Sequence, residues 1–139
     1  ERMDALTPII NMMNNDNARI TWNFTIGVST SSLNKKDEDN KEELFKKAMV
    51  ELTNKITIFS GGLTYNYCHG TWLNGKSIIN SPIEHDISCA ISVIVFPKES
   101  ETLYELVKKY TGEINNKYKL GLSHIQASKI DSSAHHFMV

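Results

Sequence analysis

The sequence predicts an α+β fold of the ferredoxin-like type, a split βαβ sandwich in which an antiparallel sheet carries two helices on one face. Two segments, 20–28 and 83–96, alternate apolar and polar residues as half-buried strands do. Two others, 41–54 and 99–118, place apolar residues at helical spacing. With 139 residues, the chain is long enough for one core and too short for two ordinary domains.

The first strand and the first helix have the clearest patterns. One face of the strand over 20–28 carries Ile20, Trp22, Phe24, Ile26 and Val28. The polar run 29–40 predicts a mobile loop, long enough to act as a lid. The apolar stripe that follows predicts a helix over 41–54, with Asp39 or Asn40 as its N-cap.

The second half of the chain is expected to complete the fold. The paired glycines Gly61-Gly62 are interpreted as a bulge that interrupts a strand, and Asn74-Gly75 marks a turn. The expected elements are, in chain order, strand segments over 56–59 and 63–67, a turn or excursion over 69–82, a strand over 83–96, a helix over 99–118 and a last strand near 120–128.

The N-terminal residues form a separate expected unit. Apolar residues at helical spacing in 4–13 predict a short helix, so residues 1–17 are assigned to an N-terminal helical extension and 18–139 to the single domain. No segment approaches the roughly 18 uninterrupted apolar residues of a membrane span. Glu1-Arg2 is interpreted as an addition before Met3 rather than as a signal peptide. We therefore expect a cytoplasmic protein with no membrane partner.

Composition argues for a small ligand. Fifteen basic and sixteen acidic side chains give a formal charge of −1, so no overall field draws the protein onto nucleic acid or an anionic membrane. Cys68 and Cys89 have neither a zinc-ligand spacing nor a disulfide framework. The histidines also lack a metal-binding spacing; they are His69, His85, His124, His135 and His136. We expect no metal, no cofactor and no nucleic-acid partner.

The helices are expected to leave one face of the sheet uncovered, and we name it the open face. Its expected residues are Thr21, Asn23, Thr25, Glu84, Asp86, Ser88 and Ser92. Such a polar face meets water, a ligand or another subunit. By analogy with other ferredoxin-like domains we expect a homo-oligomer, with a trimer favoured and the ligand near a subunit boundary.

The candidate site lies within 61–84. Gly61 and Gly62 would let the backbone come close to a ligand, with the Thr64 hydroxyl beside them. A bulge that only reshapes the strand is an equally weighted alternative.

Aromatic and acidic residues follow in the same segment. Tyr65, Tyr67 and Trp72 offer enough ring surface to stack a purine or to hold a cation, although strand aromatics such as Tyr65 are more often core residues. Alternation points Glu84 to the open face, where a carboxylate either pairs with a cation or is a solvated charge at a strand start.

The order of these features resembles a known family. It comprises the glycine pair before a strand of small polar residues, Gly70-Thr71-Trp72, Glu84 twelve residues after Trp72, and a helix and strand that end in Ser and His. Over roughly 56–128 this order resembles the phage S-adenosylmethionine (SAM) lyases, once called SAM hydrolases, in which a Gly-x-Tyr segment precedes an active-site glutamate. A CRISPR-associated relative of these enzymes, a lyase for the signalling molecule SAM-AMP, is similar in size, and the pattern is also similar to an uncharacterised family of small bacterial proteins. Trp72 stands where the family has tyrosine.

The resemblance implies a reaction that needs no water, metal or cofactor. The substrate's own carboxylate attacks its γ-carbon and expels the thioether, which gives homoserine lactone and methylthioadenosine or its AMP adduct. The protein would hold a near-attack conformer, an effect of several kcal/mol. Such a lyase would act in phage–host defence or in the turnover of a CRISPR signal.

The resemblance also implies roles for individual residues. Glu84 would be catalytic, orienting the substrate ammonium or stabilising charge near the sulfonium. The substrate-binding set comprises Gly61, Gly62 and Thr64 at the amino-acid end, Tyr65, Tyr67 and Trp72 around adenosine, and His85, His124 and Gln126. Lys35, Lys36 and Lys76 are placed to meet one phosphate. The alternative is a non-catalytic protein that binds or sequesters an adenine nucleotide, which needs Trp72 and Tyr67 but not Glu84.

Overall fold

The computed structural model describes residues 17–31, 33–73, 83–122 and 125–139. The helix expected over 4–13 lies outside these residues. In chain order the elements are β1 (Ala18–Ser29), α2 (Lys35–Ser60), β2 (Thr64–Leu73), β3 (Ile83–Val95), the 3-10 turn η1 (Pro97–Glu99), α3 (Ser100–Tyr118) and β4 (Ile125–Ser133).

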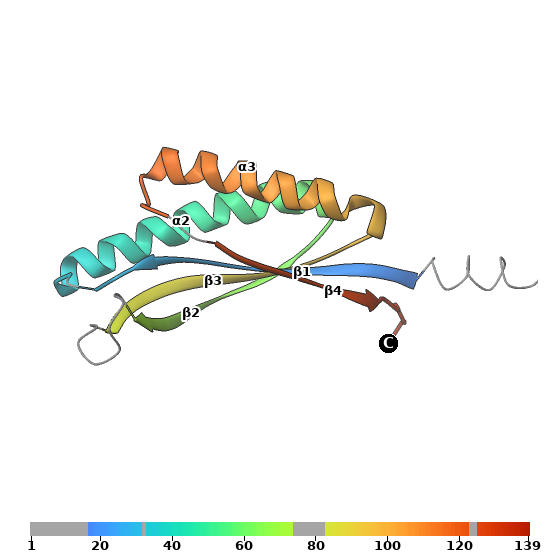
Figure 1. Cartoon of the computed structure of the whole chain (residues 1–139), viewed down its shortest axis with the longest axis horizontal. Coiled ribbons are helices and arrows are strands. Elements are labelled where there is room, and N and C mark those ends of the chain that lie inside the picture. The colour runs from blue at the N-terminus through green and yellow to red at the C-terminus, as the bar shows by residue number, and fades with distance from the viewer. Residues whose placement is uncertain (1–16, 32, 74–82, 123–124) are drawn as a thin grey trace, which may run out of the picture.

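The four strands form one antiparallel sheet in the order β2-β3-β1-β4. Both helices lie on the same side of this sheet, as Figure 1 shows, with α3 beside α2. This is the split βαβ arrangement, so the predicted ferredoxin-like fold is confirmed. The opposite side of the sheet carries no described helix (Figure 1).

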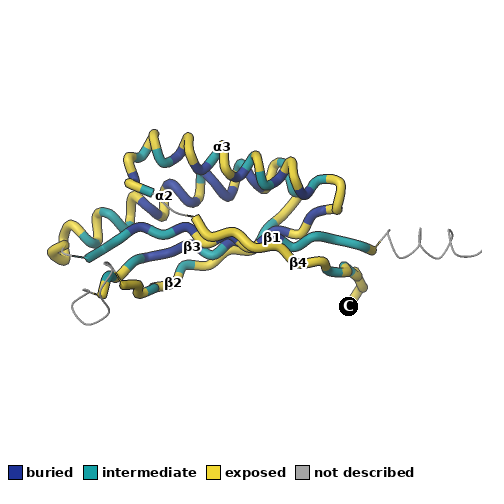
Figure 2. The backbone as a smooth tube through the Cα atoms, viewed as in Figure 1, coloured by how far each residue is buried: buried dark blue, intermediate teal, exposed yellow. Residues whose placement is uncertain are grey.

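The core lies between the helices and the two central strands. Trp22, Phe24 and Ile26 of β1 face Val93, Ile91 and Cys89 of β3 in the register, and all six are buried. The helices contribute a matching stripe: Phe45, Ala48, Met49, Leu52 and Ile56 from α2, and Leu103, Val107 and Ile114 from α3. Figure 2 shows the buried residues concentrated where the helices meet the sheet. The alternation over 20–28 therefore identified the core face correctly.

Helix α2 begins earlier than the sequence pattern indicated. The loop expected over 29–40 is wrong beyond Asn34, because α2 starts at Lys35. Asn34 is the N-cap: its side-chain oxygen accepts a hydrogen bond of 2.8 Å from the Asp37 backbone N–H. Asp37 and Glu38 then stabilise the positive end of the helix dipole.

Helix α2 also continues through the segment expected to be a strand. The strand over 56–59 and the bulge at Gly61-Gly62 are both wrong, because α2 ends at Ser60 and Gly61 is its C-cap with φ 85°. The β-branched residues fit the helix, since Thr53 and Thr57 donate hydroxyl hydrogen bonds of 2.8 Å to the carbonyls of Met49 and Thr53.

The two outer strands differ from their expected limits. Strand β2 runs unbroken to Leu73, so the turn expected from His69 is wrong over 69–73. Strand β4 covers 125–133 rather than 120–128. Leu122 is held to the end of α3, because Asn115 exchanges side-chain hydrogen bonds with its backbone N–H and C=O.

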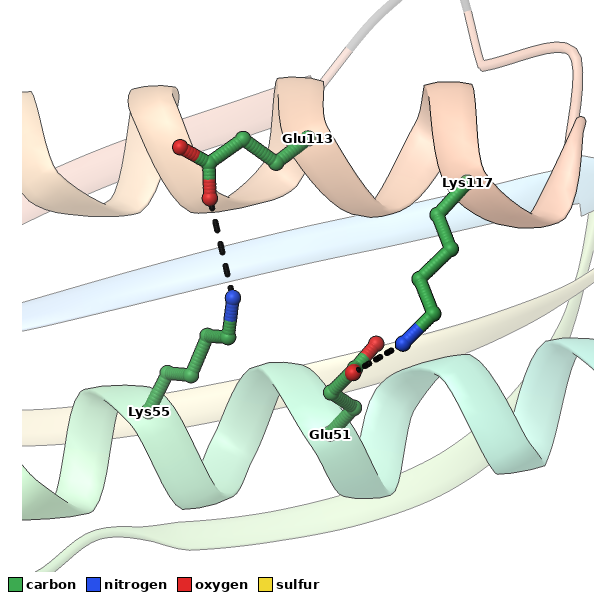
Figure 3. A network of polar contacts seen from close by, with 4 residues as sticks. All are labelled: Glu51, Lys55, Glu113 and Lys117. Carbon is green, nitrogen blue, oxygen red and sulfur yellow. Dashed lines mark hydrogen bonds and ion pairs between the residues drawn. The ribbon is translucent and has the colours of Figure 1, made fainter.

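Two ion pairs connect the helices on their outer side (Figure 3). Lys117 Nζ of α3 lies 2.6 Å from Glu51 Oε1 of α2, and Lys55 Nζ lies 3.6 Å from Glu113 Oε2. The hydrogen bond from Lys117 lowers the pKa of Glu51 below its ordinary value. These contacts fix the helix pair over the sheet, away from the open face.

Candidate functional site

The site is built at the end of the sheet where β2 finishes and β3 begins. The register pairs Trp72 with Glu84 and Gly70 with Asp86. Directly paired residues of antiparallel strands share a face, and their Cβ atoms lie about 5 Å apart. Because Ile87 and Cys89 face the core, Trp72, Glu84 and Asp86 lie on the open face.

A pocket of about 310 Å³ lies on the open face beside Trp72. We name it the open-face pocket; its lining is Thr25, Gly27, Val28, Ser29, Trp72, Asp86, Ser88, Gly121 and Gln126. The lining contains hydroxyls, an amide and one carboxylate around an indole ring that is 47% exposed. Gln126, expected in the site from the sequence, lines it, whereas Glu84 lies next to it as the cross-strand partner of Trp72.

Asp86 occupies a space that two glycines leave open. A Cβ atom on Gly70 would lie 2.6 Å from Asp86 Oδ1, and one on Gly27 would lie 2.6 Å from Ser88 Oγ and 3.2 Å from Asp86 Oδ2. The Ser88 hydroxyl also donates a hydrogen bond of 3.3 Å to Asp86 Oδ1. Sequence reasoning placed Asp86 on the open face but left it out of the site; the glycines on both neighbouring strands were the missing signal, and they are readable only once the register is known.

His85 belongs to a second pocket on the helix-covered side of the same sheet end. This pocket has a volume of about 460 Å³ and is lined by Thr30, Ser31, Glu38, His69, Gly70, Thr71, His85 and Asp86. The loop after β1 is fixed here: the Thr30 N–H donates to the His85 carbonyl at 2.9 Å, and the His85 N–H donates to Ser31 Oγ at 2.7 Å.

Tyr65 and Tyr67 face the helices, so the structure does not bring them together with Trp72. They pair with the buried Ile91 and Cys89, and the Tyr67 hydroxyl donates a hydrogen bond of 3.3 Å to a carbonyl of α2. Burial raises the pKa of Tyr67 to about 12. The three aromatics expected around adenosine therefore do not share one face within one chain, because β2 alternates without a break from Tyr65 to Trp72.

The glycine end of the expected site lies far from the acidic end. Gly61 and Gly62 lead into Thr64, which pairs with Ser92, eight residues along β3 from Glu84. Eight strand residues span about 26 Å. The structure therefore separates the residues expected at the amino-acid end of a substrate from Glu84 within one chain.

The remaining expected residues are placed only in part. Lys35 and Lys36 begin α2 and are exposed. His124 and Lys76 lie outside the described residues. No cluster of three or more His, Cys, Asp or Glu suited to a metal ion is found within the described ranges. In the same ranges no helix has the length and apolar character of a membrane span.

Comparison with known proteins shows a similarity of fold and no similarity of sequence to a known family. No protein-family model and no curated protein matches the sequence. Among solved structures, the chain is similar to the Bacillus subtilis GlnK–ATP complex (15% identity over 80% of this chain and 83% of that one, TM-score 0.43). It is also similar to a phage SAM lyase in complex with S-methyl-5′-thioadenosine (10% identity, 86% and 93%, TM-score 0.46). A Burkholderia ambifaria amidase of the hydantoinase/carbamoylase family matches over 84% of this chain but 28% of its own (7% identity, TM-score 0.43).

Proposed function

We propose that the chain is a carbon–sulfur lyase that binds SAM or its AMP conjugate at the open-face pocket and cleaves it by intramolecular displacement. The observation that supports this most directly is the cross-strand pair of Trp72 and Glu84. An aromatic ring and a carboxylate both stabilise organic cations, and SAM carries a sulfonium and an ammonium. Both residues belong to the segment that resembles the phage enzymes, in which Trp72 stands where the family has tyrosine.

The reaction balances without a group from outside the substrate. A C–O bond forms between the substrate carboxylate and its γ-carbon while the C–S bond breaks, and the bonding pair stays on sulfur. The carboxylate and the sulfonium lose their charges together, so no proton is transferred. The protein's contribution is to hold the chain folded for attack, which is an effect of several kcal/mol.

Glu84 is best assigned to the ammonium. The sulfonium loses its charge in the transition state, so a carboxylate beside it would stabilise the bound substrate more than the transition state. The ammonium keeps its charge throughout, and a carboxylate that binds it orients the reacting chain at no such cost. Trp72, half-exposed on the same face, offers its ring to the sulfonium or to the adenine.

A homo-oligomer, with a trimer favoured, would complete this site. Trp72 in the open-face pocket is half-exposed, and exposed Ile94 and Ile130 lie on the same face of the sheet. A second copy on this face would cover both isoleucines and close the pocket from above. It would also bring a second set of residues to the ligand, such as Thr64 and the Gly62 amide. Light scattering coupled to size exclusion tests this; a monomer at micromolar concentration contradicts it.

The direct test is product analysis. The protein is incubated with SAM and, separately, with SAM-AMP, and mass spectrometry looks for methylthioadenosine or its AMP adduct together with homoserine lactone. Glu84→Gln should lower kcat by at least about tenfold, whereas Asp131→Asn, a carboxylate on exposed β4, should leave it unchanged. Full activity in Glu84→Gln contradicts the role of Glu84. Bound but unchanged ligand, retained by Glu84→Gln, favours the nucleotide-binding alternative.

A further inference from the structure

We infer that Asp86 gives the open-face pocket its specificity for a charged sulfur, because its carboxylate distinguishes a sulfonium from a neutral thioether. This rests on the proposed function, since it concerns another group of the same ligand. The inference assigns a role to a residue that the sequence motif does not contain. It also concerns product release, a step that must follow the displacement reaction.

The position of the Asp86 carboxylate is fixed by what flanks it. Gly70 is its direct partner on β2, and Gly27 lies on β1 on its other side. A Cβ atom at Gly70 would lie 2.6 Å from Asp86 Oδ1, so a side chain there would displace the carboxylate, whereas a Cβ at Gly27 would lie 2.6 Å from Ser88 Oγ and 3.2 Å from Asp86 Oδ2. Glycine weakens a strand, and these two glycines leave space that the Asp86 carboxylate and the Ser88 hydroxyl fill.

The contacts of Asp86 leave acceptor capacity toward the pocket. Ser88, which is 6% exposed, donates its hydroxyl to Oδ1 at 3.3 Å. An ionised carboxylate has about four acceptor positions. Trp72 lies two residues along β2 from Gly70, so its ring is the diagonal neighbour of Asp86 on the same face. A cation in the open-face pocket would lie between an indole ring and a carboxylate.

Of the two acidic residues, Asp86 is the one that suits the sulfonium. It lines the pocket, whereas Glu84 sits beside the pocket nearer the strand end. A carboxylate next to the sulfonium stabilises the substrate, and this stabilisation disappears when the C–S bond breaks. Asp86 therefore favours substrate binding and does not hold the neutral thioether product, and it does so at some cost to the chemical step.

The test compares two ligands that are not cleaved. Sinefungin carries a protonated amine in place of the sulfonium, and S-adenosylhomocysteine has a neutral thioether there; both keep the amino-acid ammonium. Calorimetry should show that the wild-type protein prefers sinefungin. Asp86→Asn should reduce this preference about tenfold. Gly70→Ala keeps the aspartate but moves its carboxylate, and it should reduce the preference in the same direction.

Gly112→Ala is the matched control, because a Cβ there meets nothing within 4 Å. It should keep the wild-type preference. If SAM is cleaved, Asp86→Asn should raise KM and also raise kcat, because it removes stabilisation that the substrate has and the transition state loses, whereas Glu84→Gln should lower kcat.

The outcomes separate the two proposals. A preference that is unchanged in Asp86→Asn, or absent in the wild-type protein, overturns the inference whether or not SAM is cleaved. A preference that depends on Asp86 in a protein that cleaves neither SAM nor SAM-AMP supports the inference and contradicts the lyase. If thermal melting shows that Gly70→Ala is unfolded, Asp86→Asn decides.

Discussion

Trp22 Nε1 donates a hydrogen bond of 2.9 Å to Ser100 Oγ, which joins the middle of the sheet to the first residue of α3. Both residues are 6% exposed, so the indole N–H is satisfied inside the core. The Trp22 ring also stacks on Phe24 at 5.6 Å between centroids and contacts Tyr104 of α3 at 4.9 Å. One tryptophan therefore sets where the second helix begins on the sheet.

Removing the Ser100 hydroxyl should destabilise the protein. Ser100→Ala leaves the buried Trp22 N–H without its acceptor, so the free energy of unfolding should fall by about 1–3 kcal/mol. Urea unfolding followed by tryptophan fluorescence measures it. Thr102→Ala, at an exposed position of the same helical turn, is the control and should change stability by less than about 0.5 kcal/mol. Equal effects of the two substitutions would contradict the role of the hydrogen bond.

Replacing Lys117 should lower the free energy of unfolding by an amount that depends on pH. Lys117 lowers the pKa of Glu51 below 4.5, so their interaction stabilises the fold above the ordinary pKa and is lost as the pH falls through the lowered one. Wild type should have a higher free energy of unfolding than Lys117→Met at about pH 7, and this difference should disappear at about pH 3. Added salt should make the difference smaller. Lys109→Met, on the same helix, should show no such dependence on pH. A difference that persists in acid would mean that Lys117 acts through packing.

The two thiols should react at very different rates. Cys68 is exposed, whereas Cys89 is fully buried, and burial raises the pKa of Cys89 to about 11. The thiolate is the reactive form, so a disulfide reagent at about pH 8 should modify one thiol of the native protein and two in urea. Cys68→Ser should abolish the reaction of the native protein. Rapid modification of Cys89 in that variant would show that the core opens locally.

Ligand binding should be visible at Trp72. Trp22 is buried, whereas Trp72 is 47% exposed in the open-face pocket. Sinefungin should therefore change the fluorescence of the wild-type protein and not that of Trp72→Phe, and Trp72→Ala should bind it about 3- to 30-fold more weakly. A fluorescence change that survives in Trp72→Phe would place the ligand elsewhere.

The sequence predicted the fold class because its strongest signals were periodic. Alternation in β1 and β3 and the stripe in α3 each reflect one buried face. The segment 56–59 misled because Thr and Ile favour strands locally. Burial of Ile56 one turn after Leu52, together with the hydroxyl bond of Thr57 to a carbonyl of the preceding turn, outweighs that preference.

The candidate site was predicted less well than the fold, since a site depends on cross-strand neighbours. Alternation correctly put Glu84 on the open face, but nothing in the sequence separated the face of Trp72 from that of Tyr65 while a turn was assumed between them. The sequence favoured a strand bulge or a close backbone approach to a ligand at Gly61 and Gly62, whereas in the structure Gly61 is the C-cap that ends α2.

Because Gly70 lies so close to the Asp86 carboxylate, the effect of a substitution at one of these positions depends on the residue at the other. Alanine at 70 requires the Asp86 carboxylate to move, and this requirement disappears once the aspartate has been replaced by alanine. The double variant Gly70→Ala/Asp86→Ala should therefore be more stable than the sum of its single variants, a positive epistasis that a double-mutant cycle measures. If Asp86 is replaced first, residue 70 can then carry a side chain. If Gly70 is replaced first, the new side chain must displace the Asp86 carboxylate.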